Sequence, residues 1–166
     1  MKRVFKMAIV IIAAATMSMP AMAQQQGDKA IGGNLVIGTG DSYTNVGIGV
    51  KFLYNVTDPI RLAGEYDFFP KKDMVTWWDF SVYGHYLFPV ADKLVVYPSV
   101  GLGMVGSKVE ILGHSASGSD FGFSLGGGVD YALPSNPNLV LNGELRIKLF
   151  DGGNRINFAF GVAYKF

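Results

Sequence analysis

Residues 156–166 read INFAFGVAYKF, and large apolar side chains alternate there with small or polar ones. Successive side chains of a β-strand point to opposite faces. A strand at this position therefore has one apolar face and one face made of Asn157, Ala159, Gly161, Ala163 and Lys165. The segment predicts a strand, and what covers its apolar face decides the fold.

The same alternation recurs along the chain after residue 28. Val, Ile, Leu, Phe and Tyr occupy one face of each segment, and Gly, Ser, Asn or charged residues occupy the other. A period of two predicts strands that are covered on one side. The pattern is clear in five further segments: 44–55, 60–68, 78–88, 121–131 and 141–149. Two weaker segments, 30–38 and 94–105, complete a count of eight, although Pro98 weakens the pairing expected of the second.

Turn-forming residues separate the eight segments and predict an up-and-down order. Compact turns rich in proline, aspartate or asparagine are expected at 55–59, 89–92 and 134–138. The other four connections fall at the opposite end of the sheet: 39–43, 70–75, 106–119 and 151–154. An even number of strands leaves both termini at the first end, which we expect to face the periplasm. The longest connection, 106–119, is then an extracellular loop.

Two kinds of eight-stranded barrel fit this order. A soluble lipocalin-type barrel buries its apolar face, whereas a transmembrane barrel turns that face to lipid. The chain has 12 phenylalanines, 8 tyrosines and 2 tryptophans, and an eight-stranded barrel is too narrow to enclose so many. The sequence therefore predicts an all-β protein with one eight-stranded antiparallel transmembrane β-barrel.

Aromatic side chains gather near the expected strand ends. Trp and Tyr prefer the two membrane interfaces, so a transmembrane barrel should carry two aromatic girdles. One girdle is expected near the extracellular ends: Tyr66, Phe68, Phe69, Trp77, Trp78 and Phe121. The other is expected near the periplasmic ends: Tyr54, Tyr86, Phe88, Tyr131, Tyr164 and Phe166. This placement favours the membrane barrel over an aromatic-rich soluble core.

The N-terminal residues predict export. Lys2, Arg3 and Lys6 flank the start of a short apolar run, and the small-residue frame 21–23 follows it. This is the pattern of a cleaved secretory signal, and the apolar run is too short to span a bilayer. We therefore expect a signal peptide, a short periplasmic segment and the barrel at residues 1–23, 24–28 and 29–166.

Composition narrows the remaining function classes. Removing the signal peptide takes away three of the 14 basic groups. The remaining 11 are slightly outnumbered by the 13 acidic groups. That balance gives no indication of nucleic-acid binding. The chain has no cysteine, so neither a disulfide framework nor a lipid-anchoring cysteine is expected.

The polar face carries five basic and five acidic side chains, which we expect to line a narrow lumen. The basic ones are Lys51, Arg61, Arg146, Lys148 and Lys165, and the acidic ones are Glu65, Asp67, Asp79, Asp130 and Glu144. Neutrality is expected because an unpaired ion in a poorly hydrated interior costs several kcal/mol. Hairpin geometry places Lys51 opposite Glu65, which makes a plausible cross-strand pair.

The same geometry places Asp67 opposite Asp79. Like charges directly opposed are destabilising, so Arg146 or Lys148 is expected to reach across the lumen to them. A polar packed interior is the favoured interpretation, and an ionic gate in a narrow, low-conductance pore is the alternative. Glu65 together with the two aspartates is also a weak candidate for binding a divalent cation.

From about residue 28 onward, the pattern resembles the small outer-membrane barrels of the outer-membrane protein A/X type. The most specific match is to the terminal signal that the barrel-assembly machinery recognises: Phe158, Phe160, Val162, Tyr164 and Phe166. The resemblance implies a place in the outer membrane of a Gram-negative bacterium, reached through the general secretory route. It also implies handling by the barrel-assembly machinery and periplasmic chaperones, contact with outer-membrane lipid and lipopolysaccharide, and a monomeric state.

The expected function is a structural or surface-interaction role without catalysis or a cofactor. Most outer connections are short for that family, so a specific contact is expected on the longest one, at Lys108, Glu110 and His114. A lipid A-modifying enzyme is the distant alternative, with His114, Ser115 and Ser117 as its candidate groups. Their segment is rich in glycine and serine, which does not favour a preorganised catalytic site.

Overall fold

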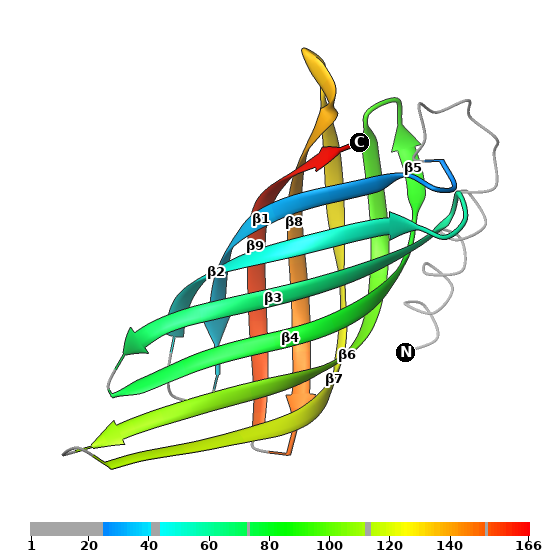
Figure 1. The fold of residues 1–166 in the computed structure, drawn as a ribbon. Coiled ribbons are helices and arrows are strands. Elements are labelled where there is room, and N and C mark those ends of the chain that lie inside the picture. Colours follow the sequence, from blue (N-terminus) through cyan, green and yellow to red (C-terminus); the bar gives the residue numbers. More distant parts are fainter. Residues whose placement is uncertain (1–24, 41–43, 73, 112–113, 152) are drawn as a thin grey trace, which may run out of the picture.

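The structure is a computed structural model that describes residues 25–40, 44–72, 74–111, 114–151 and 153–166. The predicted signal peptide, residues 1–23, lies outside the described residues. Within the described ranges, no helix is both long and apolar enough to cross a membrane. Antiparallel strands make up nearly all of the described chain (Figure 1).

Nine strand segments follow one another along the chain. They are β1 (Lys29–Thr39), β2 (Thr44–Asn55), β3 (Ile60–Lys72), β4 (Val75–Tyr86), β5 (Phe88–Ala91), β6 (Leu94–Ile111), β7 (His114–Leu133), β8 (Asn136–Phe150) and β9 (Gly153–Lys165). The sheet closes on itself because β1 pairs with β9 and β4 pairs with β6. β5 follows β4 after Leu87 and pairs with the same neighbour, β6, so β4 and β5 form one wall strand. The result is the predicted closed barrel of eight antiparallel strands.

Pro98 lies where the wall strand formed by β4 and β5 is interrupted. On β6, the ladder with β4 stops at Ser99 and the ladder with β5 resumes at Val96. Proline has no N–H to donate to a ladder, so a break of this kind tolerates it. Its other neighbour is Gly127 of β7, with which it pairs. The weak segment 94–105 is therefore a wall strand.

The prediction of a loop over residues 106–119 is wrong. β6 and β7 instead stay paired until Ile111 meets His114. Serine and glycine have low strand propensity, so the sequence favours a loop here, but the two strands satisfy each other's backbone groups. The outcome is a long hairpin that extends beyond the rest of the barrel (Figure 1).

Four other expected turns are shorter than predicted. β8 and β9 begin inside the turns expected at 134–138 and 151–154. β3 continues past Pro70 to Lys72, and β5 occupies most of the turn expected at 89–92. Pro70 and Pro89 sit beside irregular pairing, because the ladders shift register after Phe69 and after Pro89. Proline has no N–H to donate to a ladder, so it is compatible with strand ends and bulges, where that hydrogen bond is not made.

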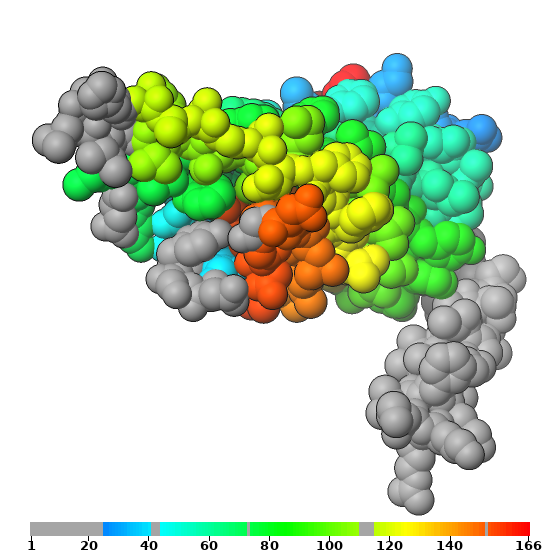
Figure 2. All heavy atoms as spheres, turned by 90° about the horizontal axis from the view of Figure 1, so that it is seen from below, coloured from blue at the N-terminus to red at the C-terminus, as the bar shows by residue number. Residues whose placement is uncertain are grey.

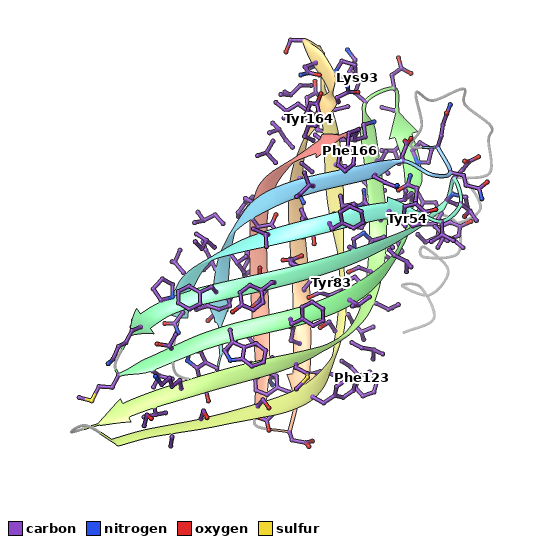
Figure 3. All side chains as sticks on the ribbon, in the orientation of Figure 1. Tyr54, Tyr83, Lys93, Phe123, Tyr164 and Phe166 are labelled. Atoms are coloured by element: carbon purple, nitrogen blue, oxygen red, sulfur yellow. The ribbon has the colours of Figure 1, made fainter. Side chains whose placement is uncertain are left out.

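Burial alternates along the wall strands, with polar side chains inside and large apolar side chains outside. In β9 the exposed side chains are Ile156, Phe158, Phe160, Val162 and Tyr164, and the buried ones are Arg155, Asn157, Ala159 and Ala163. Figure 3 labels Phe123, which is on the outer surface at 61% exposure, and Tyr83, which is on the lumen side at 1%. This orientation is that of a transmembrane barrel and the reverse of a lipocalin-type barrel.

One aromatic girdle agrees with the prediction and the other agrees only in part. Near the termini, Tyr54, Tyr86, Tyr131, Tyr164 and Phe166 are exposed, and Phe88 is partly exposed beside Tyr86. Figure 3 labels Tyr54, Tyr164 and Phe166 among them. At the opposite end, Tyr66 and Trp78 stack with their ring centroids 6.5 Å apart. Phe69 and Trp77 were expected beside them but are directed inward, where Phe69 is only 1% exposed.

The barrel has two unlike ends. At the terminal end, the N–H of Phe166 donates to the carbonyl of Lys29, and the N–H of Gly27 donates to the carbonyl of Asn55. At the projecting end, β3, β4, β6 and β7 extend past their neighbours (Figure 1). In the space-filling view, the yellow-green atoms of the β6–β7 hairpin reach out from the barrel at that end (Figure 2).

Candidate functional site: the lumen and the projecting sheet

Ten charged side chains are buried inside the barrel, and we call them the lumen charge network. The basic ones are Lys51, Arg61, Arg146, Lys148 and Arg155, and the acidic ones are Glu65, Asp67, Asp79, Asp130 and Glu144. Their formal charges cancel, which suits an interior where an unpaired ion is costly. Relative to the expected set, Arg155 replaces Lys165, whose side chain is partly exposed.

Arg146 lies at the centre of the lumen charge network. Its Nη2 is 2.7 Å from Oε1 of Glu65, and its Nε is 3.3 Å from Oε2 of Glu144. Nζ of Lys51 lies 2.7 Å from Oε1 of Glu144, although the ladder partner of Lys51 is Glu65, as predicted. Asn34 donates a further hydrogen bond to Oε1 of Glu65 at 3.0 Å. Strands from opposite sides of the barrel are thereby joined through its interior.

Asp67 and Asp79 are directly opposed on β3 and β4, as predicted. Lys148 reaches them from β8 and contacts Asp79, and its Nζ also lies 3.2 Å from the hydroxyl of Ser81. Among the described residues, neither carboxylate oxygen of Asp67 has a hydrogen-bond partner. The described chain contains no group of three or more side chains placed to hold a metal ion. The geometry therefore gives no support to the divalent-cation site suggested for Glu65 and the two aspartates.

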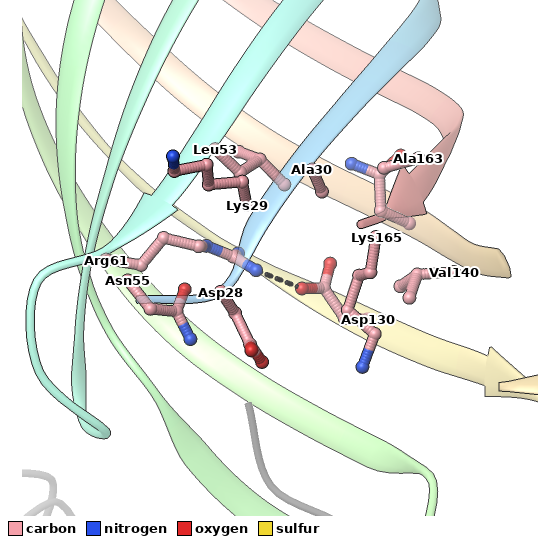
Figure 4. Close-up of a pocket in the computed structure, with 11 residues that line it drawn as sticks. Asp28, Lys29, Ala30, Leu53, Asn55, Arg61, Asp130, Val140, Ala163 and Lys165 are labelled. Carbon is pink, nitrogen blue, oxygen red and sulfur yellow. Dashed lines mark hydrogen bonds and ion pairs between the residues drawn. The ribbon is translucent and has the colours of Figure 1, made fainter. Parts of the chain in front are cut away.

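A second cluster fills the lumen near the terminal end. Nη1 of Arg61 lies 2.6 Å from Oδ2 of Asp130 (Figure 4), and Nε of Arg61 donates to Nδ1 of His85 at 3.1 Å. The ring of Tyr97 stacks on His85 and lies 4.6 Å from the Arg61 guanidinium. The adjoining cavity has a volume of about 20 Å³. That is room for about one water molecule, so this end of the lumen holds no ligand-sized pocket.

Glycines on neighbouring strands make room for the large side chains of the lumen. A Cβ on Gly101 would overlap the ring of Tyr83, and a Cβ on Gly128 would lie 2.6 Å from the hydroxyl oxygen of Tyr97. Neither position can carry a larger residue unless the ring moves. Part of the high glycine content is therefore explained by how the lumen is filled.

Arg155 is a lumen residue that the sequence analysis missed. Its guanidinium lies over two rings, 5.1 Å from the centroid of Phe69 and 4.9 Å from that of Trp77. Phe69 and Trp77 pack against Val36 and Ala159. The period of two already assigns Arg155 to the lumen face of β9, but its position beside an expected turn hid that signal.

The projecting sheet consists of the parts of β3, β4, β6 and β7 that extend beyond the barrel. β8 ends at Phe150, which pairs with Gly122 of β7. Within the described part of the chain, no strand pairs with Ser115–Phe121 on the side away from β6. This stretch of β7 is an open strand edge, which presents unpaired backbone donors and acceptors.

The candidate contact residues all lie on this hairpin. Lys108 of β6 and Ser115 and Ser117 of β7 are exposed. Glu110 and His114 pair through their backbones with Ser115 and Ile111, and their side chains lie outside the described residues. The structure therefore brings these residues onto one paired hairpin in place of the expected loop.

Comparisons with known proteins agree with this architecture. The family model described as outer membrane protein beta-barrel domain matches residues 9–166. No curated protein sequence matches the chain.

Several solved structures share the fold at low sequence identity. Ail, the attachment invasion locus protein of Yersinia pestis, is 19% identical with a TM-score of 0.62, over 86% of this chain and 100% of that one. Neisserial surface protein A is 16% identical with a TM-score of 0.66, over 84% and 96% of the two chains. The N-terminal β-barrel domain of Pseudomonas aeruginosa OprF is 18% identical with a TM-score of 0.65, over 86% and 100%. At identities this low, the similarity shows a shared fold and does not show a shared function.

Proposed function

Because this chain belongs to the family of outer membrane protein beta-barrel domains, we propose that it is a non-catalytic surface protein of the Gram-negative outer membrane. Its barrel spans the membrane, and its projecting sheet makes contacts outside the cell. The observation that carries this proposal is the open edge of β7 at Ser115–Phe121. An open edge can accept an extended segment of another protein as an additional strand.

The two free edges of the projecting sheet differ in a way that supports this role. The β3 edge carries Pro70, Lys71 and Lys72, and Nζ of Lys72 donates to the carbonyl of Thr44 at 2.6 Å. Proline and lysine are residues that protect an edge from pairing. The β7 edge, Ser115–Phe121, has neither residue type. We therefore assign the contact to the β7 edge.

The filled lumen supports a surface role over transport. A narrow pore with an ionic gate requires a hydrated path, but buried side chains and paired charges occupy the interior along its length. The described geometry gives little support to a lipid A-modifying activity, since Ser115 and Ser117 are exposed on a projecting hairpin and the ladder partner of Ser117, Lys108, is exposed as well.

The biogenesis of the protein follows from the same assignment. We propose that residues 1–23 are removed on export and that residues 24–28 remain in the periplasm, which puts the terminal end there. The β9 residues Phe158, Phe160, Val162, Tyr164 and Phe166 would serve the barrel-assembly machinery, with periplasmic chaperones acting before it. In the membrane the monomeric barrel would contact lipid and lipopolysaccharide.

Shortening the β6–β7 hairpin tests the proposed function. Gly106 and Ser119 are ladder partners, so an Asn-Gly pair in place of 107–118 makes a two-residue hairpin turn. It also removes the β6 partners of β4 residues 75–77 and keeps the β4–β6 ladder from Trp78 onward. Cells that display the wild-type protein are expected to adhere to a surface coated with an extended, strand-forming peptide, which can add to the open β7 edge. Cells that display the shortened protein should adhere no more than cells without it.

A matched control removes a charge from the protected edge. Lys71→Ser on β3 should leave adhesion unchanged, because Pro70 and Lys72 still protect that edge. A gel comparison of heated and unheated samples should show that both variants are folded. Equal adhesion by the wild-type and shortened proteins would refute the assignment to the β7 edge. Wild-type adhesion no higher than that of cells without the protein would leave a structural role only.

A further inference from the structure

The lumen is crossed near the projecting end by a layer of two aromatic rings and one guanidinium. The ring of Phe69 extends from β3 over β2 to β1, because a Cβ on Gly47 would lie 2.6 Å from ring atom Cδ1 and a Cβ on Gly38 would lie 3.3 Å from Cε1. Trp77 adds a second ring from β4. Arg155 of β9 lies over both rings, at 5.1 and 4.9 Å from their centroids.

Apolar side chains complete the layer. Val36 of β1 and Ala159 of β9 pack against Phe69 and Trp77, and Val36, Phe69 and Ala159 are each at most 1% exposed. Val105 of β6 is also buried, at 5% exposure, on the lumen face of its strand. Aromatic and aliphatic groups from β1, β3, β4 and β9 therefore pack together at this level of the barrel.

We propose that Phe69, Trp77 and Arg155 form the seal that keeps the lumen closed to solutes. The other nine members of the lumen charge network do not serve as well, because they are groups that bind water and, unlike Arg155, are not covered by the rings of Phe69 and Trp77. Buried polar atoms such as Oδ1 of Asn34 and Nη1 of Arg146 have no hydrogen-bond partner among the described residues, and such atoms favour internal water. A constriction lined by apolar groups excludes water and ions by dewetting.

The seal is located where β3 loses one of its two neighbouring strands. The β2–β3 ladder stops at Phe68, and the β3–β4 ladder becomes irregular directly after Phe69 pairs with Trp77. From Phe69 onward, β3 is therefore held by one neighbouring strand. The seal thus lies at the base of the β3–β4 hairpin of the projecting sheet, although its closure does not depend on what that sheet contacts.

A single thiol inside the lumen tests the seal. The protein has no cysteine, so Ser124→Cys introduces one reactive group. Ser124 is 4% exposed on the lumen face of β7, and its ladder partner Gly101 lies under the ring of Tyr83, deeper in the lumen than Trp77. The probe is a small cationic methanethiosulfonate reagent, which is added to the barrel folded in detergent micelles.

Ser124→Cys alone is expected to stay unmodified. Adding Phe69→Ala and Trp77→Ala should speed its modification at least about tenfold, because the apolar constriction is then lost. Phe68→Ala is the matched control, since Phe68 is the preceding residue on the same strand but lies on the outer surface at 38% exposure. It should leave the thiol unmodified, and migration of unheated samples should show that every variant is folded.

Two results would overturn the proposal. Rapid modification of Ser124→Cys with both rings in place would show that the lumen is not sealed. Slow modification in the folded variant that lacks both rings would show that the closure lies elsewhere, in the lumen charge network or in the cluster around Arg61.

Discussion

Replacing Arg146 with methionine is expected to destabilise the folded barrel by about 3–5 kcal/mol. Arg146 is fully buried and holds two carboxylates, at 2.7 Å from Glu65 and 3.3 Å from Glu144. Methionine fills part of the volume but leaves Glu65 without its cation, and Glu144 keeps only Lys51, in an interior that solvates carboxylates poorly. The free energy of unfolding, measured by urea titration of the barrel folded in lipid vesicles, checks the loss.

A second substitution separates charge from packing in this experiment. Glu65→Gln in the Arg146→Met background removes one of the stranded charges, so it should restore part of the lost stability. Lys93→Met is the matched control, because Lys93 is exposed in the turn between β5 and β6, and it should change stability by no more than about 0.5 kcal/mol. A loss for Arg146→Met as small as that for Lys93→Met would contradict the central place of Arg146.

Introducing a charge on the outer wall should also be costly. Leu102 is 49% exposed and lies midway along the apolar face, paired with Val82 and Phe123. In a membrane this side chain contacts hydrocarbon, so Leu102→Arg should destabilise the barrel by about 2–4 kcal/mol. The same urea titration in lipid vesicles measures the change.

The matched control for Leu102→Arg lies on the projecting hairpin. Ser117 is exposed on β7 beyond the apolar wall, and Ser117→Arg should change the free energy of unfolding by no more than about 0.5 kcal/mol. In a water-soluble barrel an arginine at an exposed position such as Leu102 would be equally harmless. Equal effects of the two substitutions would therefore argue against a membrane-facing wall.

The period-two pattern predicted the barrel wall from sequence because it reflects one physical constraint. Every wall strand has lipid on one side and a narrow polar lumen on the other, so each residue reports its face directly. β9 shows this best, with Phe158, Phe160 and Val162 outside and Asn157 and Ala159 inside. The hairpin registers that place Lys51 opposite Glu65 and Asp67 opposite Asp79 follow from the same count.

The predictions failed where a local preference was weighed above that pattern. Phe69 lies two residues after Asp67, and Trp77 lies two residues before Asp79. Side chains two residues apart on a strand point to the same face, so the pattern already assigns both rings to the lumen. The expectation of an aromatic girdle displaced that evidence. At residues 106–119, low strand propensity suggested a loop, although pairing between β6 and β7 satisfies the backbone there.

Ion pairs across the lumen were beyond the reach of sequence reasoning in most cases. Lys51 is the ladder partner of Glu65 but contacts Glu144, which is three strands away around the barrel. Which charges meet depends on the tilt and stagger of the closed sheet, and alternation along single strands does not encode these. Lys148 was expected at the aspartate pair only because two like charges needed a cation.

The central claim is that this chain folds as a closed barrel in the outer membrane. The most direct test extracts the protein from isolated outer membranes in mild detergent and compares heated and unheated samples on one gel. We predict that the unheated protein migrates apart from the heated one, because a closed barrel stays folded in detergent until it is heated. Identical migration of the two samples, or absence of the protein from the outer-membrane fraction, would contradict the claim.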